Sequence, residues 1–267
     1  MKILIINGSP RKGNTWKLTN AVKDDLLSLS LSENIEFEEI HLKDVNLPFC
    51  TGCSLCFRKG HQHCPHSLVT QAIMDKIEDC DGLIFSVTSY QMHVPALTKN
   101  LTDHFCYMLH RPRYFNKKGL VISTTGGVGV KRTTQFLAGT VRGWGFNRCY
   151  ELPVRAVSWN DYQLEPNDRK KMQKVSRQFY HDLNSKKLYS PKAGVLIPFN
   201  LFRGMSQTYA PGTEYETQDG VYWTKMGFQK NTYATGIPIP IHKKLFGTMF
   251  FYLAKIMSKH IMVTYKK

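Results

Sequence analysis

Short apolar runs alternate with amphipathic helical stretches through the first two thirds of this chain. Several of the runs are apolar almost throughout, which is typical of strands that are buried on both faces of a sheet. The predicted strands lie at residues 3–6, 35–41, 82–87, 119–123 and 146–154. Strands that alternate with helices in this way build βαβ units. The sequence therefore predicts an α/β fold with an open parallel sheet.

The segment that follows the first strand, residues 7–15, reads Asn-Gly-Ser-Pro-Arg-Lys-Gly-Asn-Thr and leads into a helix. The N-terminus of a helix presents unpaired backbone N–H groups and the positive end of the helix dipole, so this segment predicts an anion site. The side chains and backbone that we expect to bind a phosphate belong to Ser9, Arg11, Gly13, Asn14 and Thr15. An ordinary strand-to-helix turn is the alternative.

This loop departs from two known phosphate-binding motifs, and these departures limit the kind of phosphate-bearing ligand that we expect it to bind. Its glycines have the spacing of a P-loop, but Asn14 replaces the lysine that reaches the phosphates of a nucleoside triphosphate. Pro10 interrupts the glycine fingerprint of dinucleotide-binding folds. We therefore expect this loop to bind a ligand that carries a single terminal phosphate.

Two further polar loops follow predicted buried strands, at residues 88–93 and 124–127. Because ligands of open α/β sheets bind at the carboxyl ends of the strands, we expect both loops to meet the phosphate loop at one rim. The candidate binding residues on these loops are Thr88, Ser89, Tyr90, Gln91, Met92, His93, Thr124, Thr125, Gly126 and Gly127.

A cysteine-rich loop separates the second predicted strand from the next helix. Its cysteines follow the pattern C-x2-C-x2-C-x7-C and are Cys50, Cys53, Cys56 and Cys64. Tandem spacing followed by Cys-Pro favours a [4Fe–4S] cluster over structural zinc, which more often uses two separated Cys-x-x-Cys pairs. A zinc site that includes a histidine and a loop without metal stay open, the histidine candidates being His61, His63 and His66. The remaining cysteines are expected to be buried thiols, namely Cys80, Cys106 and Cys149.

Composition limits the partners. The 267 residues suit one large domain or one domain with an appendage, and the 36 Lys and Arg against 20 acidic residues predict an anionic partner. The basic residues are spread along the chain without a recognition motif, so nucleic acid is not expected. No signal peptide or membrane span is recognised, and the seven cysteines suit a reducing cytoplasm.

The pattern changes near residue 185. Residues 184–267 carry twelve Lys and Arg against three acidic residues, and Gly, Pro and Tyr become frequent. We therefore divide the chain into a domain of residues 1–185 and an extension of residues 186–267. Its apolar end, Leu245 to Val263, predicts a helix with Lys255 and Lys259 on one face. We expect this helix to pack on its own body or on a second subunit, with a membrane surface as the less favoured alternative.

Taken together, these motifs resemble the flavodoxin-like NAD(P)H-dependent oxidoreductases, which include NADPH-dependent FMN reductases and iron–sulfur flavoproteins. The segment Asn7–Thr15 is similar to the FMN phosphate loop of that family, and the cysteine run resembles the compact motif of the iron–sulfur flavoproteins. Residues 86–90 resemble the segment that lines the isoalloxazine ring, and residues 124–127 resemble a glycine turn on the pyrimidine side of the flavin. The resemblance covers roughly residues 1–185.

The resemblance implies a five-stranded sheet of flavodoxin order 2-1-3-4-5, FMN as cofactor, and a homodimer or homotetramer. It also implies an oxidoreductase that takes reducing equivalents from NAD(P)H through flavin N5 and delivers them to a small-molecule or protein acceptor. The protein would orient the flavin and tune its electronics without a general base of its own. A flavodoxin-like or iron–sulfur electron carrier without enzymatic activity is the alternative, although the basic charge of this chain disfavours it.

Overall fold

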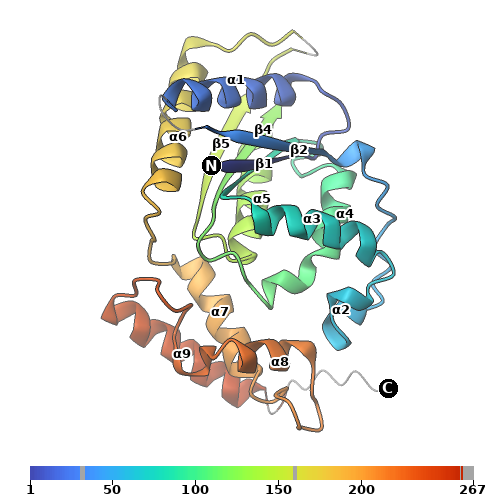
Figure 1. Cartoon of the computed structure of the whole chain (residues 1–267), viewed down its shortest axis with the longest axis vertical. Helices are drawn as coiled ribbons and strands as arrows, with labels where there is room; N and C mark the ends of the chain where they lie inside the picture. Colours follow the sequence, from blue (N-terminus) through green and yellow to red (C-terminus); the bar gives the residue numbers. More distant parts are fainter. Residues whose placement is uncertain (31–33, 159–160, 259, 261–267) are drawn as a thin grey trace.

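A parallel five-stranded sheet forms the centre of the molecule (Figure 1). The computed structural model describes residues 1–30, 34–158, 161–258 and 260. The strands are Lys2–Asn7 (β1), Glu36–His41 (β2), Gly82–Thr88 (β3), Lys118–Thr125 (β4) and Arg148–Arg155 (β5). Their order is β2-β1-β3-β4-β5, and every neighbouring pair is parallel. The predicted α/β class and strand order are confirmed.

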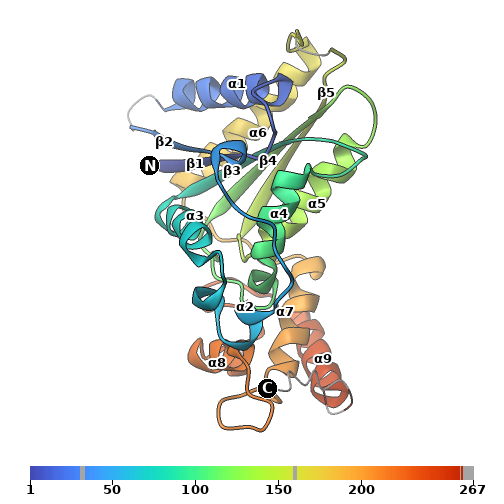
Figure 2. The same cartoon turned by 90° about the vertical axis from the view of Figure 1, so that its right-hand side faces the viewer.

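Helices cover both faces of the sheet (Figures 1 and 2). Successive strand residues point to opposite faces, so Ile3 and Ile5 pack under α1 and α6, whereas Leu4 and Ile6 pack with α3, α4 and α5. All four of these β1 side chains are fully buried, as expected for a strand covered on both sides. The helix bounds are Asn14–Leu29 (α1), Ser67–Asp79 (α3), Ala96–His104 (α4), Val130–Gly143 (α5) and Pro166–Asn184 (α6).

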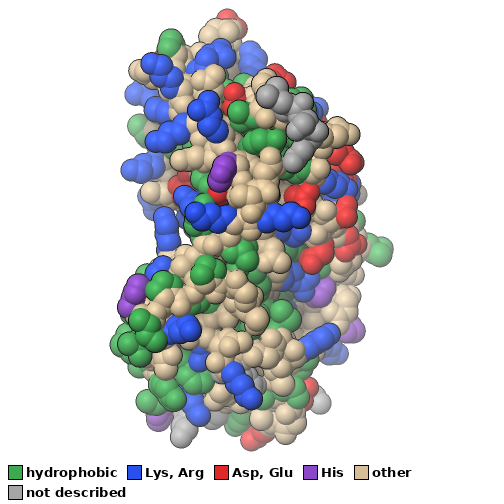
Figure 3. All heavy atoms as spheres, turned by 60° about the vertical axis from the view of Figure 1, so that its left-hand side comes forward, with side chains coloured by type: hydrophobic (Ala, Val, Ile, Leu, Met, Phe, Trp, Pro, Cys, Tyr) green, Lys and Arg blue, Asp and Glu red, His purple; other side chains and the backbone are tan. Residues whose placement is uncertain are grey.

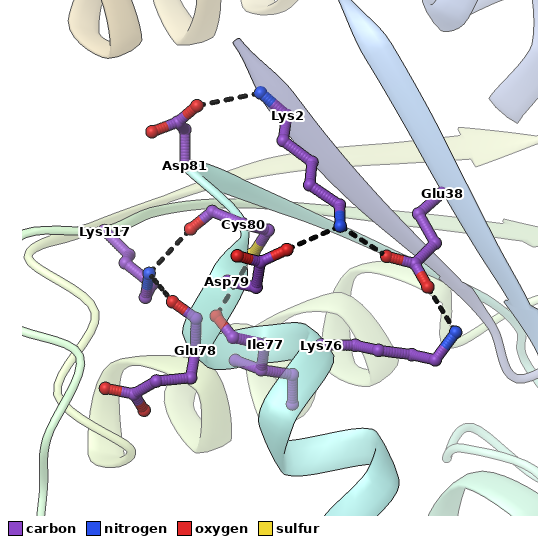
Figure 4. Close-up of polar contacts among 9 residues, drawn as sticks. All are labelled: Lys2, Glu38, Lys76, Ile77, Glu78, Asp79, Cys80, Asp81 and Lys117. Atoms are coloured by element: carbon purple, nitrogen blue, oxygen red, sulfur yellow. Dashed lines mark hydrogen bonds and ion pairs between the residues drawn. The ribbon is translucent and has the colours of Figure 1, made fainter.

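A charged network closes the amino-terminal edge of the sheet (Figure 4). The ammonium group of Lys2 lies 3.0 Å from Glu38 Oε2 and 2.6 Å from Asp79 Oδ2, and Lys76 bonds the other oxygen of Glu38. The hydrogen bond from Lys76 lowers the pKa of Glu38, because it favours the ionised carboxylate, and Lys2 acts in the same direction. This network joins β1, β2 and α3 at the edge away from the polar loops.

We expect Glu38→Gln to lower the free energy of unfolding by about 1 kcal/mol or less near pH 7, because exposed ion pairs contribute little. The pKa of Glu38 is lower in the folded chain than its ordinary value of 4.5. The stabilisation is therefore present above pH 4.5 and is lost as the pH falls through the folded value. Urea unfolding of both proteins at pH 7 and pH 3 measures this difference, with Glu36→Gln on the same strand as the control. Equal differences at the two pH values would contradict the ion-pair account.

In its described residues, the extension adds three α-helices below the sheet, Ala193–Met205 (α7), Gln218–Lys225 (α8) and Ile241–Met257 (α9). Its aromatic core includes Phe199 and Trp223, and Phe115 from the preceding part of the chain packs into the same cluster. The extension is thus joined to the body by apolar contacts. The division at residue 185 remains a prediction.

Helix α9 confirms the expected terminal helix but begins earlier than predicted, at Ile241. Pro240 directly precedes its first residue, and proline suits a helix start because its φ is fixed near the helical value and its missing N–H would have no partner within the helix. The helix packs along α7, as expected for packing on its own body. Lys259 lies outside the described residues.

Within the described residues, we find no helix with the length and apolar character needed to cross a membrane.

Candidate active site

A cavity of about 540 Å³ opens at the carboxyl edge of the sheet. This size lies within the range of about 300–1,000 Å³ that is usual for small-molecule sites. Twelve of the fifteen predicted cofactor-binding residues line it: Ser9, Arg11, Gly13, Asn14, Thr15, Thr88, Ser89, Tyr90, Thr124, Thr125, Gly126 and Gly127. The three polar loops therefore meet at one rim, as the strand pattern indicates.

The first loop is held against the sheet by a close backbone approach at Gly8. Its N–H donates to Ser86 O at 2.8 Å, and its carbonyl accepts from Thr98 Oγ1 at 3.1 Å. A β-carbon on this residue would lie 2.0 Å from the Thr98 hydroxyl oxygen and 3.0 Å from a methyl group of Val87. Only glycine fits here without a displacement of the loop or of the side chains that it contacts.

Hydroxyl groups tie the three loops to one another. The Oγ of Ser9 accepts from the backbone N–H of Thr88 at 2.9 Å, and the hydroxyls of Thr15 and Thr124 are 2.6 Å apart. The N–H of Ser89 donates to Thr124 O at 2.9 Å. These bonds position the loops before any ligand binds.

The electrostatic character of this cavity favours an anion. Helix α1 starts at Asn14, directly after Gly13, without a side-chain cap and with no acidic residue in its first turn. None of the described residues that line the cavity is acidic, and Arg11 adds a positive charge. The N-terminus of α1 can therefore receive a phosphate.

Asn14 presents an acceptor rather than a donor. Its side-chain N–H₂ donates to Ser158 O at 2.7 Å, while its buried Oδ1 has no hydrogen-bond partner among the residues that the structure describes. An amide oxygen has no proton to donate to a phosphate oxygen, but it can accept a hydrogen bond from a hydroxyl group of a ligand. The expected phosphate contact of Asn14 therefore fits a ligand hydroxyl better.

Three predicted residues lie outside the lining of the cavity, Gln91, Met92 and His93. Gln91 and Met92 both adopt positive φ angles, so the chain turns back on itself and Tyr90 pairs with His93 through two backbone hydrogen bonds of 2.9 Å. The ring of His93 packs against Phe136 with a centroid distance of 4.2 Å. Nothing in the local sequence signals this turn, because neither central residue is glycine or asparagine.

Sequence reasoning missed the segment Ala156, Val157 and Ser158, which also lines the cavity. This segment directly follows β5, and Ala156 N donates to Thr125 O at 2.8 Å, which extends the sheet pairing to the rim. The rule that ligands bind at the carboxyl ends of strands, applied to the fifth strand, would have found it.

The cysteine loop runs beside α4 and contains the short helix α2, Leu55–Arg58. Asn100, a buried residue of α4, fastens the entrance of the loop: its Oδ1 accepts from Cys50 N at 3.0 Å, and its Nδ2 donates to the carbonyls of Leu47 and Pro48 at 3.1 Å. Gly52 and Ser54 have positive φ angles, which produce the tight turn around Cys53. The bonds of α4 thus fix where the loop begins.

The four predicted cysteines lie in one electrostatic environment. Burial raises the pKa of the Cys64 thiol, and negative charge on Cys53, Cys56 and Cys50 raises it further. Cys50 and Cys53 are exposed, whereas Cys56 and Cys64 are partly buried. Such a group of thiols is a suitable donor set for iron or zinc.

The structure corrects the expectation that Cys106 is a buried thiol. Cys106 is exposed and hydrogen-bonds Cys56, and this contact lowers the pKa of Cys106 and raises that of Cys56. The two residues are far apart in the sequence, so no local pattern could reveal the contact. Cys80 and Cys149 are buried, as predicted.

One histidine of the loop approaches Cys64. The ligand atoms of Cys64, His66 and His104 lie within 4.8 Å of one another. His104 Nδ1 must donate to Asn100 O at 2.9 Å, and its Nε2 bonds His66 Nδ1 at 2.9 Å. Both ring nitrogens of His104 are therefore engaged in hydrogen bonds, which would have to break before this imidazole could bind a metal. His61 instead stacks on Tyr107.

The extension reaches the cysteine loop through a buried arginine. Arg111 Nη2 donates to Cys56 O at 2.6 Å, and Arg111 Nη1 lies 3.4 Å from Asp219 Oδ1 on α8. Asp219 also bonds His110, and Trp223 Nε1 donates to His110 O at 3.0 Å. Helix α8 therefore holds the segment that places a positive charge beside the thiols.

Comparison with known proteins agrees with this geometry. Residues 1–151 match the NADPH-dependent FMN reductase family. An iron–sulfur flavoprotein of Clostridioides difficile is 30% identical over 188 residues, which cover 70% of this chain and 81% of that protein. An iron–sulfur flavoprotein of Archaeoglobus fulgidus is 34% identical over 103 residues, 39% of this chain and 48% of that one.

Among solved structures, an azoreductase of Bacillus anthracis superposes with a TM-score of 0.50 at 14% identity and covers 69% of this chain and 99% of its own. This likeness concerns the fold alone. The family match spans more than half of the chain, and the Clostridioides relative is aligned over most of its length. The chain therefore belongs to the NADPH-dependent FMN reductase family and is an FMN-dependent oxidoreductase.

Proposed function

We propose that this chain oxidises NAD(P)H with FMN bound in the cavity at the carboxyl edge of the sheet and passes the electrons to a small-molecule or protein acceptor. The observation that carries the proposal is the convergence of three loops on one cavity with a helix N-terminus at one end. The name of the family supplies the nicotinamide donor. Bound FMN would supply the redox chemistry, accepting a hydride at N5 and releasing electrons to the acceptor.

The fit of FMN rests on two kinds of group in the cavity. A terminal phosphate suits the first turn of α1, where Gly13 and Thr15 offer backbone N–H groups and Arg11 a charge. The Oδ1 of Asn14, which has no partner among the described residues, is closed to solvent in this structure and would accept from a ribityl hydroxyl after a rotation of the side chain. Phosphate and hydroxyls together favour FMN over a bare phosphate.

The residues on the ring side would orient the flavin. Tyr90 is 48% exposed at the mouth of the cavity, where its aromatic face can cover a flat ring. The backbone around Gly126 and Gly127 is open, since a β-carbon on Gly127 would meet nothing within 4 Å. N–H groups there can hydrogen-bond the pyrimidine edge and stabilise negative charge on it.

The cysteine loop would hold a [4Fe–4S] cluster through Cys50, Cys53, Cys56 and Cys64. The tandem spacing of these cysteines and the engagement of His104 in hydrogen bonds favour an all-thiolate site over a mixed zinc site. A bound cluster would let electrons leave singly. Seven free cysteines suit a reducing compartment such as the cytoplasm, which we include in the proposal.

The absorption spectrum of anaerobically purified protein, together with its iron content, tests this proposal. We expect flavin bands, about four iron atoms per chain and oxidation of NADH or NADPH on addition of a quinone or nitroaromatic acceptor. Flavin without iron would overturn the cluster alone. A flavin that no nicotinamide reduces would favour an electron carrier, and a protein that takes up no FMN would overturn the whole proposal.

Replacing Asn14 and Thr15 with alanine should lower FMN occupancy at least several-fold while the chain stays folded. Thr15→Ala breaks the hydroxyl pair with Thr124, and Asn14→Ala removes both the anchor to Ser158 and the free acceptor. The flavin-to-protein absorbance ratio after gel filtration measures the loss. Asn20→Ala, farther along α1, is the control. Unchanged FMN occupancy would show that the loop does not bind the phosphate of FMN.

A further inference from the structure

Helix α9 presents an apolar face that the rest of the described chain leaves uncovered. Its exposed large side chains include Ile241 at 71%, Leu245 at 67% and Ile256 at 63% exposure. At 100° per residue these three positions lie within 60° of one another around the helix axis. The other exposed apolar side chains of the helix are Met249, Tyr252, Leu253 and Met257.

The opposite face of α9 is fixed against α7, so the apolar face cannot turn inward. A β-carbon on Gly204 of α7 would lie 2.4 Å from Phe251 O, and one on Gly247 of α9 would lie 2.8 Å from Asn200 Nδ2. The buried guanidinium of Arg203 lies 4.1 Å from the ring centroid of Phe251 and donates to Asn200. This close packing at two glycines holds the orientation of the helix.

Positive charge surrounds the apolar face. On α9 itself Lys244 and Lys255 are exposed at one border of the apolar face, and His242 lies within it. The solvent side of α6 carries a row of exposed basic residues, Arg169, Lys170, Lys171, Lys174 and Arg177. Figure 3 shows Lys and Arg gathered over α6 and hydrophobic side chains gathered over α9 on the same face of the molecule.

We propose that this face docks on the surface of an anionic phospholipid bilayer, with the apolar side of α9 in the interface and the basic row of α6 over the headgroups. An amphipathic helix with a basic border binds membrane surfaces through this combination of buried apolar area and charge. Each Lys or Arg near an anionic surface strengthens binding by about fivefold. The proposal does not depend on the flavin chemistry, because binding is measured without turnover.

A second copy of the chain is the less suitable occupant. The chain has a formal net charge of +16, and a contact between two identical faces would bring the same basic residues together without an opposite charge. An anionic bilayer meets both features of the face, since its headgroups neutralise the basic residues while its interface accepts the apolar side chains.

Co-sedimentation of the flavoprotein, with all 267 residues of the chain, with vesicles tests the proposal. We expect at least tenfold stronger binding to phosphatidylcholine vesicles that contain phosphatidylglycerol than to phosphatidylcholine alone, and weaker binding at 0.5 M salt. The double variant Leu245→Glu/Ile256→Glu should lose at least tenfold, and so should Lys170→Glu/Lys174→Glu. Leu68→Glu, at an exposed apolar position on α3, is the matched control and should bind like the wild type.

The FMN content of each variant verifies that it is folded. Failure of the wild type to bind anionic vesicles, or full binding by the α9 double variant, would overturn the proposal. Sedimentation velocity gives a further readout: an oligomer that the α9 substitutions dissociate, without vesicle binding, would assign the face to a second copy. Equal binding to neutral vesicles would overturn the role of the basic row.

Discussion

Replacing Gly8 with alanine is expected to weaken FMN binding by at least about tenfold, which corresponds to about 1.4 kcal/mol. The added methyl group would lie 2.0 Å from Thr98 Oγ1 and 3.0 Å from a methyl group of Val87, so either the loop or these side chains must shift. Insertion of a methyl group into a tightly packed site costs about 1–3 kcal/mol, and the displacement would also disturb the anion site at α1. Fluorescence titration of the apoprotein with FMN measures the change.

Two companion variants separate this steric effect from a general loss of structure. Gly139→Ala on α5 adds the same methyl group where nothing lies within 4 Å, and it should leave FMN binding unchanged. In the double variant Gly8→Ala/Thr98→Ala, the clashing hydroxyl is removed, so part of the affinity should return. Wild-type affinity in Gly8→Ala alone would refute the assignment of this loop as the phosphate site.

The second large effect is expected at Asn100, where alanine should reduce the iron content of the anaerobically purified protein to less than half. The substitution removes three hydrogen bonds that hold the entrance of the cysteine loop, and it leaves Cys50 N and the carbonyls of Leu47 and Pro48 without these partners. An unsatisfied buried polar group costs about 1–3 kcal/mol. The entrance of the loop, and Cys50 with it, would then no longer be held in place against α4.

Iron and flavin should be quantified together in this variant. Lys99→Ala, at the neighbouring position of α4, breaks only an exposed ion pair with Asp103 and serves as the control. Asn100→Ala should lose much less FMN than iron, because the hydrogen bond from Thr98 to the glycine loop is untouched and only the coupling through α4 acts on the flavin. Full iron content would indicate that the loop does not need this anchor.

The sheet and the position of the glycine loop at its rim could be predicted because their signals are local. The apolar runs at Ile3–Ile6 and Gly82–Val87 are short and bounded by turns, and a loop of glycine and hydroxyl residues precedes a helix. Because the carboxyl ends of parallel strands lie at one edge of a sheet, the loops that follow β1, β3 and β4 could be predicted to lie together. The strand order itself came from the family resemblance, since alternation of strands and helices does not fix it.

The features that were missed depend on contacts between distant residues or on unusual local backbone. Cys106 contacts Cys56, which lies 50 residues earlier in the sequence. Met92 has a positive φ angle although it is not a glycine, so its residue type does not indicate this conformation. In the extension, α7 contains Pro198, which normally argues against a helix interior, and α7 owes its place to packing against α9. Tertiary contacts outweigh local propensity at these positions.

Helix α4 touches both candidate cofactor sites with residues only two positions apart. Thr98 donates to the phosphate loop at Gly8, and Asn100 holds the cysteine loop at Cys50. A small shift of α4 would change both the contact of Thr98 with Gly8 and the contact of Asn100 with Cys50. We therefore expect that binding of FMN at one site and of a cluster at the other are thermodynamically coupled. Binding free energies are reciprocal. If bound FMN raises the affinity of the cysteine loop for its cluster by some factor, then the bound cluster must raise the affinity for FMN by the same factor. The order in which the two cofactors bind does not change this factor.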